Sequence, residues 1–242
     1  MKKLTLKSRE KIERVFTRRA AKYDSESPWM KHHLATQPFI PEPFGGRQAL
    51  DLCAGTGLIT KALVEEGWDA VALDLTSNML KDADILGRVV ADATCTPFQS
   101  STFDLIVCRQ GLHYLDEGAA ASELSRLRPK EIRLGQIVAP NEDSADWWSD
   151  LFKTLAPGRK RVYMPSDLEK FVDKLVGTWA VNIIKFSLAD SFSQNFKHLQ
   201  DRNKTIAETM VRDMPREIAS AMDFDGDVYR QDWEVIIASA ID

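Results

Sequence analysis

Between residues 47 and 140, short apolar segments of strand type alternate with segments of helical periodicity. The strand-like segments are RQALDLC, DAVALDL, GRVVADA, FDLIVCRQ and RLGQIVAP, and the helix-like segments among them are LITKALVEEG, SNMLKDA and AAASELSRL. Strands that alternate with helices form a parallel sheet that is covered on both faces. Because crossovers between parallel strands are right-handed, we expect a doubly wound α/β fold.

The pattern changes after Pro140. SADWWSDLFKTL and SDLEKFVDKL are typical of helices, each with its first serine at the N-cap. AVNIIKFSLADSF alternates like a strand, a helical stretch follows from Ser193 to about Met222, and DWEVIIASAI closes the chain as a strand. We therefore expect a mainly parallel seven-stranded sheet, with a helical lid at about residues 191–226 that folds over it before the last strand.

The N-terminal part precedes this pattern. A helix is expected at about residues 8–22 and a second from near Pro28, before QPFIPEPFGG interrupts regular structure. We divide the chain into a helical cover over residues 1–40 and a domain over residues 41–242. Residues 1–22 carry nine basic side chains against two glutamates. They form either a patch for an anionic partner or, as we favour, the solvated face of an amphipathic helix.

Composition limits the class of protein. The 242 residues carry a net charge of −4 and contain no apolar run long enough to cross a membrane. The N-terminal segment lacks the continuous apolar core of a signal peptide, so a cytoplasmic location is expected. Cys53, Cys95 and Cys108 form no CxxC or Cys/His cluster. We expect them to be small buried side chains, with no disulfide and no zinc site.

The segment ALDLCAGTGLIT has the form of a ligand-binding loop, because it follows the first strand and precedes a helix. A dinucleotide fingerprint requires a third glycine, but Thr60 stands where that glycine would be. A phosphate loop requires Gly-Lys-Ser/Thr, but Leu58 follows Gly57. The loop is therefore suited to a nucleotide-like ligand that carries no pyrophosphate.

Three acidic residues lie at the carboxyl ends of the first three strands: Asp51, Asp74 and Asp92. Asp51 would repel a phosphate and attract a cationic ammonium group. Asp74 comes nineteen residues after Gly55, where a carboxylate can accept hydrogen bonds from both hydroxyls of a ribose. Capping of a strand end is the alternative for any one of the three.

The segments ALDLCAGTGLITKALVEEGWDAVALDLTSNML and ADATCTPFQSSTFDLIVCRQGLHYL resemble the class I S-adenosylmethionine-dependent methyltransferases. The likeness extends from about residue 12 to residue 139, includes FTRRAAKYD, and is greatest to the small-molecule branch with the quinone C-methyltransferases and the malonyl-carrier O-methyltransferase. Two departures are Cys53, where the family usually has glycine, and RPKEIRLGQ, which replaces a Pro-Gly-Gly turn.

The resemblance implies S-adenosylmethionine as cofactor and a role for each matching residue. Asp51 would approach the methionine ammonium, Asp74 would hold the ribose hydroxyls, and Asp92 would meet the adenine amine. Tyr23 would close the carboxylate end from the N-terminal helices, although ordinary packing explains it as well. The residues implied to bind the cofactor are Tyr23, Asp51, Ala54, Gly55, Gly57, Asp74, Leu75, Met79, Asp92, Ala93 and Arg109.

Methyl transfer needs alignment, exclusion of water and, for some acceptors, removal of a proton. CRQGLHYL offers His113 and Tyr114 as catalytic residues after the fourth strand, with His113 as a general base or a substrate-orienting donor. A histidine that caps the following turn is the alternative. His32 and His33 are weaker candidates. No metal site is expected, since Glu142, Asp143 and Asp146 suit a helix start and DFDGD suits a turn.

One absent motif and three tryptophans indicate the class of substrate. It has no Asn/Asp-Pro-Pro-aromatic motif after the fourth strand, so a nucleic-acid substrate is not expected. Trp147, Trp148 and Trp179 indicate either an apolar substrate pocket or plain core. We expect methylation of a small organic molecule or a carrier-linked acyl group. The alternatives are a non-methylating protein that binds the cofactor and a nucleic-acid methyltransferase guided by the basic N-terminal helix; the oligomeric state is left open.

Overall fold

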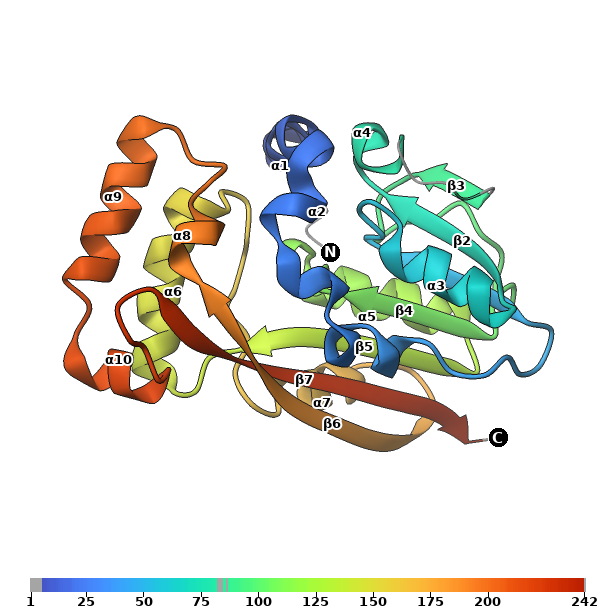
Figure 1. Ribbon diagram of the computed structural model, residues 1–242. Coiled ribbons are helices and arrows are strands. Elements are labelled where there is room, and N and C mark those ends of the chain that lie inside the picture. The colour runs from blue at the N-terminus through green and yellow to red at the C-terminus, as the bar shows by residue number, and fades with distance from the viewer. Residues whose placement is uncertain (1–5, 82–84, 86, 242) are drawn as a thin grey trace.

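The computed structural model describes residues 6–81, 85 and 87–241, and its sheet has the strand order β3-β2-β1-β4-β5-β7-β6 (Figure 1). β7 runs antiparallel to both of its neighbours, and the other strand pairs are parallel. The strands are β1 (Gln48–Leu52), β2 (Asp69–Asp74), β3 (Gly87–Val90), β4 (Leu105–Arg109), β5 (Glu131–Val138), β6 (Thr178–Ser191) and β7 (Val228–Ile241). The predicted doubly wound, mainly parallel seven-stranded sheet is confirmed.

Helices cover the sheet and extend beyond it. They are α1 (Leu6–Arg19), α2 (Tyr23–Glu26), α3 (Leu58–Glu66), α4 (Ser77–Leu80), α5 (Glu117–Leu127), α6 (Glu142–Leu155), α7 (Asp167–Val172), α8 (Phe192–Asn195), α9 (Asp201–Arg212) and α10 (Arg216–Ala221). Short 3-10 turns at residues 20–22, 28–31, 33–35, 37–39 and 112–114 complete the regular structure. The second N-terminal helix expected from Pro28 is thus a 3-10 turn.

Local sequence explains where several helices begin and end. Gly67 ends α3 in a left-handed conformation (φ 105°), and its amide donates to the carbonyls of Leu63 and Val64. Asp116 caps α5 through a hydrogen bond from the Ala119 amide. The expectation that Ser144 caps α6 is wrong. Asn141 is the cap, because its side chain accepts from the Ser144 amide, and the helix therefore begins three residues earlier.

The helical stretch after β6 is not one continuous lid. It is divided into α8, α9 and α10, because the chain turns at residues 196–200 and Pro215 starts a new helix. With α6 these helices enclose a second apolar core, which lies beyond the arrowheads of β4 and β5 in Figure 1. Its buried side chains include Leu151, Leu155, Phe192, Phe196, Ala207, Val211, Ile218, Met222 and Tyr229. The division into a cover at 1–40, a domain at 41–242 and a lid stays a prediction.

The segment before β1 lies against the sheet through buried contacts. The Arg109 guanidinium donates to the carbonyl oxygens of Met30 (2.7 Å) and Ala35 (3.2 Å), and Arg133 donates to the carbonyl oxygen of Pro38 (2.7 Å). Phe39 is fully buried against Gly135, where a β-carbon would lie 2.3 Å from the Phe39 ring. Only glycine at position 135 leaves room for this ring.

The amphipathic interpretation of α1 is confirmed over its described side chains. Ile12 is buried, whereas Lys11, Arg14 and Arg18 are exposed. Of the other basic residues in this cluster, Lys2 and Lys3 lie outside the described residues. A face of this kind needs no partner to account for its charge.

Two expectations from composition are tested by the coordinates. Within residues 6–81, 85 and 87–241, no helix combines the length and the apolar character that crossing a bilayer requires. Cys108 is buried and Cys53 half-buried, but Cys95 is exposed, so the expectation of three buried cysteines is wrong for Cys95.

Candidate functional site

A cavity lies at the carboxyl ends of β1, β2 and β4, with Ile12 and Phe16 of α1 over it. We call it the loop cavity, because the glycine loop after β1 forms part of its wall. Most residues that the family resemblance implies for cofactor binding line it: Tyr23, Asp51, Ala54, Gly55, Asp74, Leu75, Met79, Asp92, Ala93 and Arg109. Gly57 is not among the lining residues. Its amide donates to the Ala54 carbonyl and its own carbonyl accepts from Lys61, so it closes the loop and starts α3.

The loop owes its shape to three residues in the left-handed region, Cys53 (φ 58°), Gly55 (φ 57°) and Gly57 (φ 78°). Glycine adopts this region freely, whereas cysteine carries a steric cost of about 1 kcal/mol or more. The backbone explains why the family usually has glycine at position 53. A β-carbon on Gly55 would lie 3.3 Å from Cε of Met79, so this glycine also keeps the cavity wall open.

Asp74 joins the end of β2 to the glycine loop. One of its carboxylate oxygens accepts from the Gly55 amide (2.9 Å) and the other from the Thr76 amide (2.8 Å). Burial raises the pKa of Asp74, although these hydrogen bonds oppose the shift. Each carboxylate oxygen retains a lone pair for a hydroxyl donor in the cavity.

Asp51 and Arg109 form the charged part of the loop cavity. The Asp51 carboxylate accepts from the Thr60 hydroxyl (2.7 Å), and burial raises the pKa of Asp51 to about 6 against the opposing effect of Thr60 and of the Arg109 charge. Burial lowers the pKa of Arg109 to about 10. Arg109 therefore has two effects. It brings positive charge to the cavity, and it fastens the N-terminal segment to the end of β4.

The remaining predicted residues complete the wall. Asp92 is buried, and one of its oxygens accepts from the amide (2.8 Å) and the hydroxyl (2.7 Å) of Thr94. Leu75, Met79 and Ala93 add an apolar surface, of which Met79 and Ala93 are buried. The wall of the cavity thus combines apolar side chains with acidic groups.

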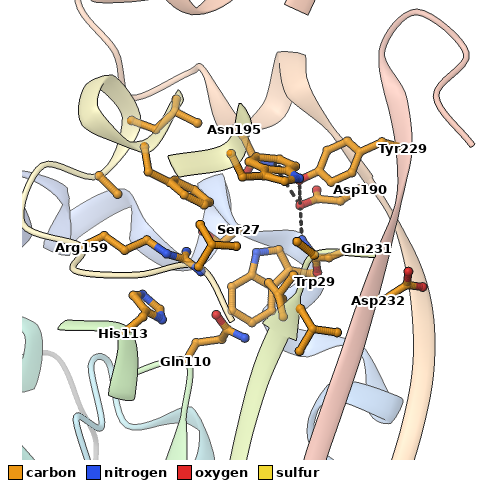
Figure 2. Close-up of a pocket in the computed structure, with 18 of the residues that line it drawn as sticks. Ser27, Trp29, Gln110, His113, Arg159, Asp190, Asn195, Tyr229, Gln231 and Asp232 are labelled. Atoms are coloured by element: carbon orange, nitrogen blue, oxygen red, sulfur yellow. Dashed lines mark hydrogen bonds between the residues drawn. The ribbon is translucent and has the colours of Figure 1, made fainter. Parts of the chain in front are cut away.

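A second cavity lies between the N-terminal segment, α6 and the β6–β7 hairpin (Figure 2). We call it the hairpin cavity. Its lining includes Ser27, Ile137, Trp148, Phe152, Arg159, Asp190, Asn195, Tyr229 and Gln231. Four residues line both cavities and so form the boundary between them: Tyr23, Trp29, Gln110 and Tyr114.

Sequence reasoning missed two of these boundary residues, Trp29 and Gln110. Gln110 directly follows β4, has a left-handed backbone (φ 55°), and its side-chain Nε2 is buried without a hydrogen-bond partner among the described residues. Its place immediately after the fourth strand was a signal that could have identified it. For Trp29 the sequence offers no comparable signal, since it reaches the site only through the docking of the N-terminal segment.

The two predicted catalytic residues lie on the 3-10 turn after β4. Tyr114 lines both cavities, and burial raises its pKa to about 12. His113 lines the hairpin cavity alone, with its Nδ1 2.8 Å from Oε1 of Gln136. Burial and the charge of Arg159 hold the pKa of His113 well below its usual value, so the ring is neutral at pH 7. His32 and His33 stack on each other and line neither cavity.

Of the three tryptophans for which we left pocket and core as alternatives, one lines a cavity. Trp148 lines the hairpin cavity. Trp147 packs instead against the second apolar core, and Trp179 lies at the start of β6, packed against the main core. The C-terminal end of β6 lines the hairpin cavity, through Asp190.

Comparison with known proteins agrees with this geometry. The methyltransferase domain family matches residues 50–130. An uncharacterized methyltransferase of Mycobacterium bovis is 30% identical over 134 residues, which cover 51% of this chain and 54% of that protein. A ubiquinone/menaquinone biosynthesis C-methyltransferase of Cereibacter sphaeroides is 34% identical over 115 residues, covering 40% and 46% respectively. The chain spans about half the length of the curated relatives it matches.

Solved structures share the fold at low sequence identity. The YcgJ protein from Bacillus subtilis has a TM-score of 0.72 at 16% identity, over 86% of this chain and 97% of that chain. Phosphoethanolamine N-methyltransferase 2 of Haemonchus contortus, solved with S-adenosyl-L-methionine, has a TM-score of 0.58 at 14% identity, over 97% and 60% respectively.

Proposed function

We propose that this chain, which carries a class I S-adenosylmethionine-dependent methyltransferase domain, binds S-adenosylmethionine in the loop cavity and methylates a small organic or carrier-linked molecule in the hairpin cavity. The observation that carries the proposal is the shared wall of the two cavities, formed by Tyr23, Trp29, Gln110 and Tyr114. Donor and acceptor would meet at this wall, and the transfer would take place there.

The residues of the loop cavity fit this cofactor. Asp74 has free lone pairs for two ribose hydroxyls, and its other contacts already hold it in place. Asp51 offers a carboxylate to an ammonium group, and Leu75, Met79 and Ala93 offer an apolar slot to a planar base. The loop carries no lysine or arginine that would favour a pyrophosphate. When bound, the cofactor supplies an electrophilic methyl group on a sulfonium.

The protein would contribute alignment and a dry environment. Tyr23 and Tyr114 have pKa values raised by burial, so their hydroxyls remain protonated and can donate hydrogen bonds to an acceptor. With Oε1 of Gln136 as the partner, the proton of His113 lies on Nδ1, which leaves Nε2 as a neutral acceptor. His113 can therefore accept a hydrogen bond from the acceptor and orient it, while its lowered pKa makes it a weak base.

Two measurements test the proposed function. Calorimetry should detect S-adenosylhomocysteine binding in the micromolar range, and incubation with S-adenosylmethionine and cell extract should release S-adenosylhomocysteine over time. Binding without turnover across extracts would favour the non-methylating alternative. Failure to bind would refute the cofactor assignment itself.

Cofactor affinity is expected to depend on pH through Asp51. Since burial raises the pKa of Asp51 to about 6, the free protein takes up a proton at this group below that pH, and an ammonium ligand must displace it. Affinity for S-adenosylhomocysteine should be flat above pH 6 and fall up to about tenfold per unit below it. Calorimetry from pH 5 to 8 gives the profile. Asp51→Asn should bind weakly with a flat profile; an unchanged slope in this variant would exclude Asp51 as the titrating group.

Replacement of His113 is expected to lower turnover more than binding. Loss of a positioned acid–base group typically reduces the rate by about 100-fold or more, whereas His113 does not line the loop cavity. His113→Ala should therefore keep S-adenosylhomocysteine affinity within about threefold and lose most of the rate of its formation. His33→Ala, at an exposed ring outside both cavities, is the matched control. Parallel loss of binding and turnover in His113→Ala would contradict the assigned role.

A further inference from the structure

The hairpin cavity contains an arginine that no acid among the described residues neutralises. Arg159 follows α6, and Figure 2 shows its side chain extending into the cavity. Its Nε donates to the Arg161 carbonyl (3.0 Å), and its guanidinium carbon lies 3.9 Å from the centroid of the Phe152 ring. Among the described residues no carboxylate forms an ion pair with it. Burial lowers its pKa only to about 10, so it is charged at neutral pH.

The groups nearest to Arg159 are neutral. The side chains that act on its charge are Tyr23, Tyr114, Tyr163 and Tyr229. Burial raises the pKa of each of these phenols, so none of them supplies a negative charge at neutral pH. His113, on the same side of the cavity, is neutral as well.

The acidic groups of the same cavity are already satisfied. One oxygen of Asp190 accepts from Asn195 (3.0 Å), Tyr229 (3.0 Å) and Gln231 (2.9 Å), and its other oxygen accepts from the Ser191 amide. Asp232 accepts from Ser187 and Arg230. Figure 2 shows this network across the cavity from Arg159. These carboxylates have hydrogen-bond donors within the protein and lie across the cavity from Arg159, so they do not pair with it.

A second arginine adds to the positive charge. Arg19 lines the hairpin cavity, and its guanidinium carbon is 4.9 Å from the centroid of the Tyr23 ring. Its Nε is buried and has no hydrogen-bond partner within the part of the chain that the structure describes. A buried charged donor without a partner is costly in free energy. Guanidinium groups match the oxygens of a carboxylate or a phosphate, which would supply the missing partner.

We infer that the methyl acceptor is an acid, whose carboxylate or phosphate pairs with Arg159 while its apolar body packs on Trp29, Trp148 and Phe152. Arg19 strengthens the positive field around the same group, and the unpartnered Nε2 of Gln110 offers a donor at the boundary to the loop cavity. The two arginines would repel a cationic amine. This inference rests on the proposed function, because it assigns the hairpin cavity to the methyl acceptor.

The test compares probes that share a naphthyl ring and differ in the charge of their polar group. Calorimetry with 2-naphthoate, 2-naphthyl phosphate and the neutral 2-naphthamide is carried out on the protein saturated with S-adenosylhomocysteine. At least one of the two anions should bind tenfold or more tightly than the amide. Preference for the naphthoate identifies a carboxylate acceptor, and preference for the phosphate ester identifies a phosphorylated one. Equal affinities, or no anion binding up to millimolar concentration, would overturn the inference.

Variants test whether the preference for anionic probes depends on Arg159. Arg159→Met should reduce the anion preference below threefold and leave the affinity for S-adenosylhomocysteine, whose cavity Arg159 does not line, unchanged. Arg159→Lys, which keeps the charge, should retain part of the preference, and Arg212→Met, at an exposed arginine of α9, should retain all of it. A full preference in Arg159→Met would overturn the inference. The affinity for S-adenosylhomocysteine is measured separately, so a failure of the proposed function is recognised independently of the anion result.

Discussion

Replacement of Asp74 by alanine is expected to weaken S-adenosylhomocysteine binding at least about 100-fold, which corresponds to about 3 kcal/mol. Two losses combine. The variant lacks the acceptor for the ribose hydroxyls, and the Gly55 and Thr76 amides lose the carboxylate that holds them at 2.9 Å and 2.8 Å. Hydrogen bonds to a charged acceptor contribute about 1.5–3 kcal/mol each, so the estimate is conservative. Calorimetry at pH 7.5 measures the effect.

Asp69→Ala is the matched control. Asp69 lies at the opposite end of β2, is exposed and accepts a hydrogen bond from Gln48. This variant should bind S-adenosylhomocysteine as the parent protein does. Circular dichroism verifies that Asp74→Ala is folded. If its affinity for S-adenosylhomocysteine fell less than tenfold, Asp74 would shape the loop without contacting the ligand.

Arg109→Met is expected to lower the free energy of unfolding by about 2–4 kcal/mol and to impair both cavities. The methionine fills much of the space, but the carbonyl oxygens of Met30 and Ala35 lose their donor. The segment that carries Tyr23 and Trp29 would then be held by its remaining contacts, which include Arg133 and Phe39. Denaturant titration measures the stability, and limited proteolysis should cut the variant first within residues 20–40.

Arg212→Met provides the comparison for this second variant. Arg212 is an exposed arginine whose described ion pair is with Asp213. The free energy of unfolding of the variant should therefore change by no more than about 0.5 kcal/mol. If Arg109→Met lowered the free energy of unfolding as little as Arg212→Met and resisted protease as well, the N-terminal segment would not depend on Arg109.

The glycine loop and the acidic residues could be predicted because topology determines their positions. In a parallel sheet the carboxyl ends of neighbouring strands meet, so Asp51, Asp74 and Asp92 had to converge once the strands were recognised. The mainly parallel seven-stranded sheet was predicted as well, whereas the strand order and the antiparallel direction of the last strand were not. These inferences needed only local pattern and a general rule of chain connection.

The hairpin cavity could not be predicted, because its wall comes from segments that are far apart in the sequence. Arg159 lies on a connection with no strand or helix pattern of its own, and it meets Trp29 and Tyr229 only in the folded chain. The expected lid is divided into α8, α9 and α10 for a local reason. Apolar spacing continues through residues 193–222, but the chain turns at residues 196–200 and Pro215 starts a new helix.

The two cavities also differ in where their residues lie along the chain. The loop cavity is built mainly within residues 50–130, whereas Arg19, Arg159, Asp190 and Tyr229 of the hairpin cavity lie outside this range. Substitutions in the outer segments can alter the acceptor without disturbing the donor site. Under the proposed function, a match to the family over residues 50–130 therefore carries information on the methyl donor and little on the acceptor.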